Sequence, residues 1–252
     1  MVYSYPYPSY NWAYQGFDFW GMPMNDTIAG EMYADGVRFV GRYLYADRYP
    51  NGKGITPAEA QCYLNAGIRI FFFYEVDAGD ALGGYDAGYA NGNACLAQAQ
   101  DLNVPLGTQI YCCCDTGVTD AQAAGVVMQY LDGFADALPD YNTGIYGGEN
   151  VMIACYNQFS QNYRCQAGAM GWNEFDPINI RQWMIAHNQQ AQSDGYIRIQ
   201  NVTIDSSGYA YWRGTNVDLL SADDLTNMWG SGPVPPTPDD QGMPLWFYLK
   251  LF

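Results

Sequence analysis

Positive charge is scarce in this sequence. Lys and Arg together number 10 against 26 Asp and Glu, for a formal net charge of −16 across 252 residues. This balance argues against a nucleic-acid partner, because phosphate backbones are bound through clustered cations. Histidine is nearly absent too, since His187 is the only one, so sites built from several histidines are excluded. We expect no metal site and no cofactor, and we interpret His187 as a bystander.

Long hydrophobic runs are also missing. No stretch approaches the ~20 apolar residues of a membrane span. The first residues show neither the basic nor the apolar region of a signal peptide, so we expect any export to follow a non-classical route. The seven cysteines contain no C-x-x-C spacing, and we interpret the consecutive Cys112, Cys113 and Cys114 as small buried hydrophobes, with Cys113 facing away from the other two. Cys155 and Cys165 could pair, which the sequence does not decide.

Apolar and aromatic residues are abundant, at 49% and 16% of the chain, with 23 Tyr and 7 Trp. This content excludes disorder as the dominant state, and the length suits one large domain. Aromatic rings together with carboxylates are typical of sugar-handling sites. We predict an aromatic and Pro-rich extension over 1–14, a main domain over 15–229, and a Pro-rich linker with an apolar tail over 230–252.

The two ends of the chain differ from its middle. The tail over 243–252 is almost entirely apolar, and a free tail of this kind would promote aggregation. We expect it, like the N-terminal extension, to dock on its own domain or on a neighbouring subunit. The sequence therefore predicts protein partners and a place in an oligomer or larger assembly.

Between the ends, strand and helix patterns alternate. Thr56 and Thr119 begin capped helices, Gly67 ends the first of these, and Ser221 is expected to begin a last helix. Nearly continuous apolar strands between helices indicate a parallel sheet covered on both faces, and eight candidates favour a (β/α)8 TIM barrel. A β-hairpin over 196–213 is expected as an insertion near the seventh helix. The strands are expected at 16–20, 37–43, 68–75, 108–115, 143–147, 166–172, 180–185 and 216–220.

Polar side chains stand at or near the ends of these strands. In barrels the loops at the carboxyl ends of the strands converge on one mouth, so we expect a shared polar pocket there. Buried like charges raise one another's pKa, which is how an acid–base pair is made. Taken singly, each residue could instead cap a helix or pair with an arginine, and Arg42 could serve to neutralise a carboxylate. The set comprises Asp18, Arg42, Glu75, Asp115, Tyr146, Gln182, Trp183 and Asp218.

Several of these strands resemble a known family. The segments that carry the likeness are GFDFW (16–20), GVRFVGRY (36–43), TPAEA (56–60), IYCCCD (110–115), GIYG (144–147), RQW (181–183) and VDL (217–219). They resemble the glycoside-hydrolase-like domain of actinobacterial secreted proteins and phages, a TIM-barrel family related to the family-25 lysozyme-type muramidases. The likeness covers about residues 15–229, although 165–214 departs from the family.

The resemblance implies a carbohydrate pocket. It points to Glu75, Asp115 and Asp18 as catalytic residues, and to Arg42, Tyr146, Gln182, Trp183 and Asp218 as substrate-binding residues. The muramidases carry Asp-x-Glu on the fourth strand with the Glu as proton donor, whereas this chain reads Asp115-Thr116-Gly117. Our initial hypothesis gives the donor role to Glu75, with Asp115 ionised as base, nucleophile or electrostatic stabiliser.

Two classes of function follow. We predict a glycoside-hydrolase-like barrel that acts on or binds bacterial cell-wall or surface glycan as a tail-associated component of a phage virion. The extensions, and the lack of both a signal peptide and a cationic wall-binding module, favour this prediction. The alternatives are a soluble phage endolysin-type muramidase and a structural tail protein without catalysis. A different small-ligand barrel enzyme is disfavoured because no recognisable glycine-rich phosphate loop occurs.

Overall fold

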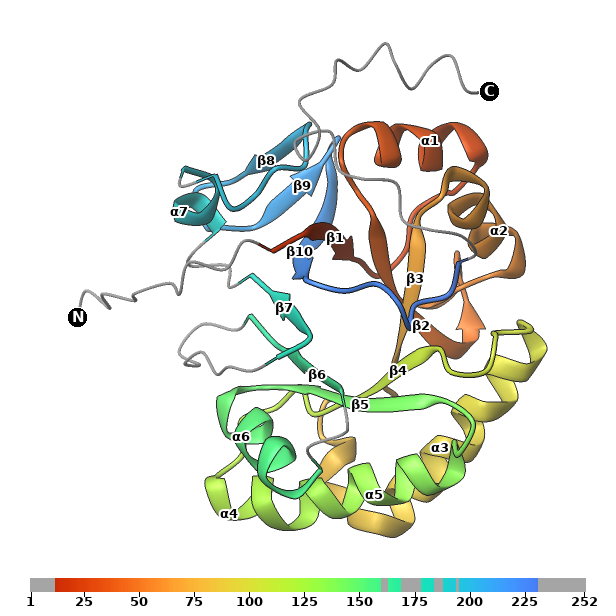
Figure 1. Cartoon of the computed structure of the whole chain (residues 1–252), viewed down its shortest axis with the longest axis vertical. Coiled ribbons are helices and arrows are strands. Elements are labelled where there is room, and N and C mark those ends of the chain that lie inside the picture. The colour runs from red at the N-terminus through yellow and green to blue at the C-terminus, as the bar shows by residue number, and fades with distance from the viewer. Residues whose placement is uncertain (1–11, 160–162, 169–177, 184–187, 194, 231–252) are drawn as a thin grey trace.

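A closed eight-stranded barrel forms the body of the protein (Figure 1). The computed structural model describes residues 12–159, 163–168, 178–183, 188–193 and 195–230. The expected α/β barrel is confirmed. His187, the extension up to residue 11 and the segment 231–252 lie outside the described residues, so the predictions about them, domain boundaries included, stay predictions. In order around the barrel the strands are β1 (Tyr14–Asp18), β2 (Phe39–Arg48), β3 (Arg69–Tyr74), β4 (Gln109–Cys113), β5 (Asn142–Gly147), β6 (Tyr163–Gln166), β7 (Ile180–Gln182) and β10 (Thr215–Ala222).

The last barrel strand runs against the others. Neighbouring strands from β1 to β7 pair in parallel, whereas β10 is antiparallel to both β7 and β1. The prediction of a fully parallel (β/α)8 sheet is therefore wrong for this strand. A strand can be parallel to its neighbour only if the connection crosses back to the starting edge. The hairpin after β7 does not return the chain to the amino ends of the parallel strands. β10 therefore begins at their carboxyl ends and runs toward their amino ends.

The predicted β-hairpin is confirmed, with shorter strands than expected. β8 (Val202–Ile204) and β9 (Ala210–Trp212) pair antiparallel, and β9 continues onto the first half of β10. The carboxylate of Asp35, just after α1, anchors this sheet by accepting hydrogen bonds from Asn201, Trp212 and Arg213. Burial acts to raise the pKa of Asp35, but these hydrogen bonds outweigh it and lower the pKa.

Helices surround the barrel, and their starts follow the sequence signals. The hydroxyl groups of Thr56 and Thr119 accept hydrogen bonds from Glu59 N and Gln122 N, and Gly67 ends its helix with a φ of 82°. The elements are α1 (Asp26–Ala34), α2 (Pro57–Ala66), η1 (Asp80–Gly83), α3 (Gly84–Asp101), α4 (Asp120–Gln122), the π-helical turn η2 (Ala123–Val127), α5 (Met128–Ala137), α6 (Glu149–Gln158) and α7 (Asn188–Ser193). In the described part of the chain, no helix is long and apolar enough to cross a membrane.

The expected final helix after Ser221 is wrong. Ser221 still belongs to β10, and residues 223–230 cross the amino ends of β3 and β4 as a strap. Trp229 exchanges two backbone hydrogen bonds with Ile70, and Gln109 N donates to Asn227 O at 2.7 Å. These long-range bonds offset the helical hydrogen bonds that the strap does not make, so tertiary context overrides the local capping signal.

Two apolar layers separate the inside of the barrel from its outer surface. Cys113 belongs to the inner cluster with Phe71, Phe73 and Tyr111, while Cys112 and Cys114 belong to the outer core beneath the helices. This alternation confirms the predicted orientation of the three cysteines. All seven cysteines are free thiols, so Cys155 and Cys165 do not pair.

Candidate functional site

One end of the barrel gathers the polar residues of several strands into a cavity of about 80 Å³. Asp18 and Gln182 are the last residues of β1 and β7, Glu75 directly follows β3, and Asp115 lies two residues after β4. The topology therefore brings together six of the eight predicted site residues. The lining consists of Asp18, Tyr43, Phe73, Glu75, Cys113, Asp115, Tyr146, Gln182 and Asp218.

Asp218 reaches this cavity from the antiparallel strand. The register pairs Asp18 directly with Asp218 across β1 and β10. Directly opposed residues of an antiparallel pair project to the same face, with Cβ atoms only about 5 Å apart. Asp218 thus lies in the cavity as the sequence predicted. It stands in the middle of the antiparallel strand β10, however, and not at the carboxyl end of a parallel strand.

The acid at position 75 is held in an ion pair that the sequence reading missed. The Nζ atom of Lys53 donates to Glu75 Oε2 at 2.7 Å, and Lys53 is only 7% exposed. Its ammonium group lies 4.5 Å from the ring centroid of Tyr43 and 5.8 Å from that of Trp20. Lysine occurs only twice in the whole chain, at 53 and 250, and that scarcity was a usable signal.

The side-chain amide of Gln182 links two other lining residues, Tyr146 and Asp18. Gln182 Oε1 accepts hydrogen bonds from Tyr146 Oη and from the backbone N of Gly168, both at 2.9 Å. Gln182 Nε2 donates to Asp18 Oδ2 at 3.3 Å. The two acceptances at Oε1 fix the orientation of the amide, which leaves its NH2 group facing the Asp18 carboxyl.

Asp18, Asp115 and Asp218 have raised pKa values. Burial, followed by the charge of Asp218, raises the pKa of Asp18 well above its ordinary value. Burial raises the pKa of Asp218 to about 6. Burial, Glu75 and Asp218 together raise the pKa of Asp115 to about 6, against the opposing influence of Lys53. The cavity therefore retains protons near neutral pH, as a general acid must.

Arg42 lies outside the cavity, which corrects its predicted role in substrate binding. Its side chain is fully buried; Nε bonds Glu59 Oε1 at 2.7 Å and Nη1 donates to Phe19 O at 2.5 Å. Arg42 thus neutralises a buried carboxylate, which was the alternative reading, and ties β2 to α2 and to the segment after β1. Successive strand residues alternate between faces, so Tyr43 points inward and Arg42 outward.

Trp183 is likewise outside the cavity. It is 4% exposed, its Nε1 donates to Ser221 Oγ at 2.8 Å, and its ring stacks on Tyr196 at 5.9 Å. Because Gln182 faces the interior, the next residue must face away. The predicted contact of Trp183 with substrate is therefore corrected to packing between the barrel and the segment before the hairpin.

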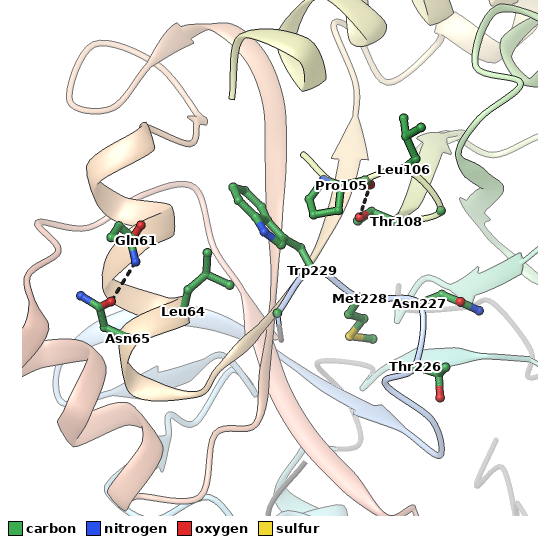
Figure 2. Close-up of a pocket in the computed structure, with 12 residues that line it drawn as sticks. Gln61, Leu64, Asn65, Pro105, Leu106, Thr108, Thr226, Asn227, Met228 and Trp229 are labelled. Carbon is green, nitrogen blue, oxygen red and sulfur yellow. Dashed lines mark hydrogen bonds between the residues drawn. The ribbon is translucent and has the colours of Figure 1, made fainter. Parts of the chain in front are cut away.

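A larger groove of about 650 Å³ opens at the opposite end of the barrel, near the amino ends of β3 and β4 (Figure 2). Gln61 and Asn65 of α2 line one side, and the indole of Trp229 from the strap lies across it. None of its lining residues is acidic, basic or a histidine, so the groove cannot supply a general acid or base. The smaller cavity is therefore the candidate active site. The lining residues are Gln61, Leu64, Asn65, Pro105, Leu106, Gly107, Thr108, Thr226, Asn227, Met228, Trp229 and Gly230.

The lining chemistry of the cavity shows what it can hold. The polar groups that line it are carboxyl groups, phenols, an amide and a thiol, and the ammonium group of Lys53 pairs with Glu75. Among the described residues, no group of three or more His, Cys, Asp or Glu side chains is arranged to hold a metal ion. The residues present therefore suit proton transfer and hydrogen bonding to hydroxyl groups.

Comparison with known proteins identifies relatives of this barrel. Residues 31–218 match the family described as the Rv2525c-like, glycoside hydrolase-like domain, which confirms the resemblance seen in the strand motifs. The matched range includes Glu75, Asp115 and Asp218 and begins after Asp18. No curated protein sequence matches the chain.

Similar solved structures include the Tat-secreted protein Rv2525c of Mycobacterium tuberculosis, with 18% identity and a TM-score of 0.64, covering 86% of this chain and 99% of that chain. An uncharacterised B. stearothermophilus protein has 15% identity and a TM-score of 0.57, with 86% and 100% covered. The Clostridium perfringens spore cortex lytic enzyme SleM has 11% identity and a TM-score of 0.50, with 88% and 71% covered. At these identities, the likeness establishes a common fold.

Proposed function

Since the chain belongs to the family of Rv2525c-like, glycoside hydrolase-like domains, we propose that its barrel cleaves a glycosidic bond in bacterial cell-wall glycan. The observation that carries the proposal is the contrast between two cavity acids. Asp115 has a pKa of about 6, whereas Glu75 is bonded to the Lys53 ammonium. Paired carboxyl groups in different environments are the machinery of glycoside hydrolysis.

In this mechanism Asp115 is the proton donor. With a pKa of about 6 it carries a proton in about one molecule in ten at pH 7, and this form can protonate the leaving oxygen. Glu75, bonded to the Lys53 ammonium, would either activate the water that attacks the anomeric carbon or attack that carbon itself, in which case water then hydrolyses the glycosyl ester. This assignment exchanges the roles predicted from the sequence, because Asp115 is the acid whose pKa is raised to about 6.

The remaining cavity residues position the sugar in this proposal. Asp18 and Asp218 lie opposite each other, and burial favours their neutral forms. A neutral carboxyl group can donate a hydrogen bond as well as accept one, which suits a hydroxyl-bearing substrate. Tyr146 and Gln182 hold Asp18 in its orientation.

The test is cleavage of labelled, insoluble peptidoglycan by the full chain. We expect soluble label and new reducing ends from the wild type, and a release at least about 100-fold slower from Asp115→Asn. Leu106→Ala, in the uncharged groove, is a matched control and should retain full activity. A wild type that releases no label while it still binds the wall would refute hydrolysis.

Binding without cleavage is the second candidate, and one observation favours it. The cavity of about 80 Å³ admits a few water molecules but not a whole sugar ring, and the fourth strand is followed by Asp115-Thr116-Gly117 without a second acid. In the same assay this function predicts wall-bound protein, no released label, and binding that Asp18→Asn weakens.

We also propose that the protein works as a tail-associated component of a phage virion. The support is sequence alone: an aromatic N-terminal extension and the apolar residues 243–252, both suited to protein contacts. Size-exclusion chromatography of the full chain and of a variant ending at Gly230 tests this. Concentration-dependent assembly that disappears on truncation supports the virion role over that of a free endolysin, and a monomer in both cases contradicts it.

A further inference from the structure

We propose that Trp20 is a sugar-stacking platform at the mouth of the carboxylate cavity, binding the apolar face of a pyranose ring next to the reacting bond. This inference rests on the proposed function and names a substrate contact of that same site. Sequence reasoning placed Trp20 only within the GFDFW segment and gave it no role.

Trp20 is the most exposed aromatic side chain in the described segments, at 66%. Its neighbour Phe19 is 4% exposed and packs in the outer core with Phe17. Leaving most of this side chain in water forgoes the burial by which tryptophan usually stabilises a fold. An indole displayed in this way suits a partner with an apolar face.

The ring lies beside the reacting groups. Lys53 Nζ is 5.8 Å from the centroid of Trp20 and 2.7 Å from Glu75 Oε2, so the indole and the carboxylate flank one ammonium group. Trp20 also follows Asp18, a cavity residue, by only two positions. A sugar ring stacked on Trp20 would therefore present its edge to the cavity.

The backbone beneath Trp20 is held in place. Arg42 Nη1 donates to Phe19 O at 2.5 Å and lies 3.4 Å from Trp20 O. A Cβ atom on Gly21 would lie 2.5 Å from Tyr49 Cδ2, so this residue packs directly against the loop after β2. A preorganised aromatic surface loses little conformational entropy when it binds.

The size of the cavity favours such a platform. At about 80 Å³ it admits a hydroxyl group or the bridging oxygen, but the body of the sugar must remain outside. The uncharged indole also offers an attractive contact to a neutral glycan in a chain of net charge −16.

The experiment measures binding of β-1,4-linked N-acetylglucosamine oligomers and of soluble peptidoglycan fragments by titration calorimetry of the full chain. We expect Trp20→Ala to weaken binding about tenfold and Trp20→Phe to weaken it less, since a smaller ring still stacks. Tyr209→Ala, which removes a 44%-exposed aromatic side chain from the loop between β8 and β9, is the matched control and should bind as the wild type does.

The outcomes separate this inference from the proposed function. If the wild type binds glycan and Trp20→Ala binds equally well, the platform is refuted and the proposed function stands. If the wild type binds none of these glycans, both fail. If Trp20→Ala binds weakly but Trp20→Phe is equally weak and both shift the pH profile of activity, the effect acts through Lys53 and the stacking role is overturned.

Discussion

The two ends of the barrel provide an informative comparison. The end formed by the carboxyl ends of the parallel strands holds a cavity of about 80 Å³ with four acids, while the opposite end holds a groove of about 650 Å³ with no ionisable lining residue. Volume alone would favour the groove as the functional site. Burial of titratable groups points to the cavity, and only titratable groups can transfer protons at neutral pH. The comparison teaches that the titratable side chains of this barrel gather where the parallel strands end and not in the larger of the two openings.

The largest expected effect sharpens this comparison directly. Asp115→Asn keeps the shape of the cavity but removes its proton donor, so we expect a 10²–10⁴-fold loss of glycan cleavage. Asn227→Ala, in the groove, should change the rate less than twofold. Initial rates of reducing-end release measure both. Equal losses in the two variants would remove the functional distinction between the ends.

A smaller effect concerns the ion pair between Lys53 and the cavity residue Glu75. Lys53→Met leaves Glu75 without its partner, and we expect a loss of about 2 kcal/mol in the free energy of unfolding, less than for a fully dry pair because Glu75 is partly exposed. Adding Glu75→Gln removes the unpaired charge and should restore most of this loss. Urea denaturation measures it, and additive losses in the double variant would show that the two side chains are not coupled.

Stability should also depend on pH in a way that the groove cannot produce. Asp18, Asp115 and Asp218 have raised pKa values, so the folded protein binds protons more tightly than the unfolded chain. The free energy of unfolding should therefore fall as the pH rises from about 4 to about 6 and beyond, by about 2 kcal/mol from Asp218 alone. Asp35 acts oppositely, because its lowered pKa gives stability that is lost at lower pH.

Urea denaturation between pH 4 and pH 7 checks this slope. Asp218→Asn should flatten it, while Asn227→Ala should leave it unchanged. Stability that rises steadily across this range would show that the cavity acids are ionised in the folded protein.

The smallest effect concerns the hydrogen bonds of the Gln182 amide. Tyr146→Phe removes the hydrogen bond to Gln182 Oε1, worth about 1 kcal/mol, and so loosens the amide that faces Asp18. We expect a roughly fivefold fall in kcat/KM with little change in the pH optimum. Gln182→Ala should cause a similar fall, and the double variant should add little, since both act through one contact. A larger fall in the double variant than in either single one would separate the two roles.

The sequence predicted the barrel and most of the cavity because these depend on local patterns. Asp18 and Glu75 end apolar strands, and strand ends converge in any such barrel. Arg42 and Trp183 were misplaced although the period of two already assigns them to the outer face, next to the inward Tyr43 and Gln182.

Other features could not be predicted locally. Lys53 sits in a glycine-containing loop, and its pairing with Glu75 exists only once β2 and β3 are side by side. The antiparallel direction of β10 depends on the end of the barrel at which the hairpin leaves the chain. No residue of β10 itself determines this. The strap over 223–230 replaced a predicted helix because its backbone bonds Ile70 and Gln109, residues more than 100 positions away.

The central claim is that Asp115 carries the transferable proton, and carbon NMR of carboxyl groups tests it most directly. A titration of the wild type, with Asp115→Asn to assign the resonance, should show the Asp115 carboxyl titrating near pH 6. In Lys53→Met its midpoint should move higher, because the opposing cation is gone. A midpoint near 4, the ordinary value for an aspartate, would contradict the account.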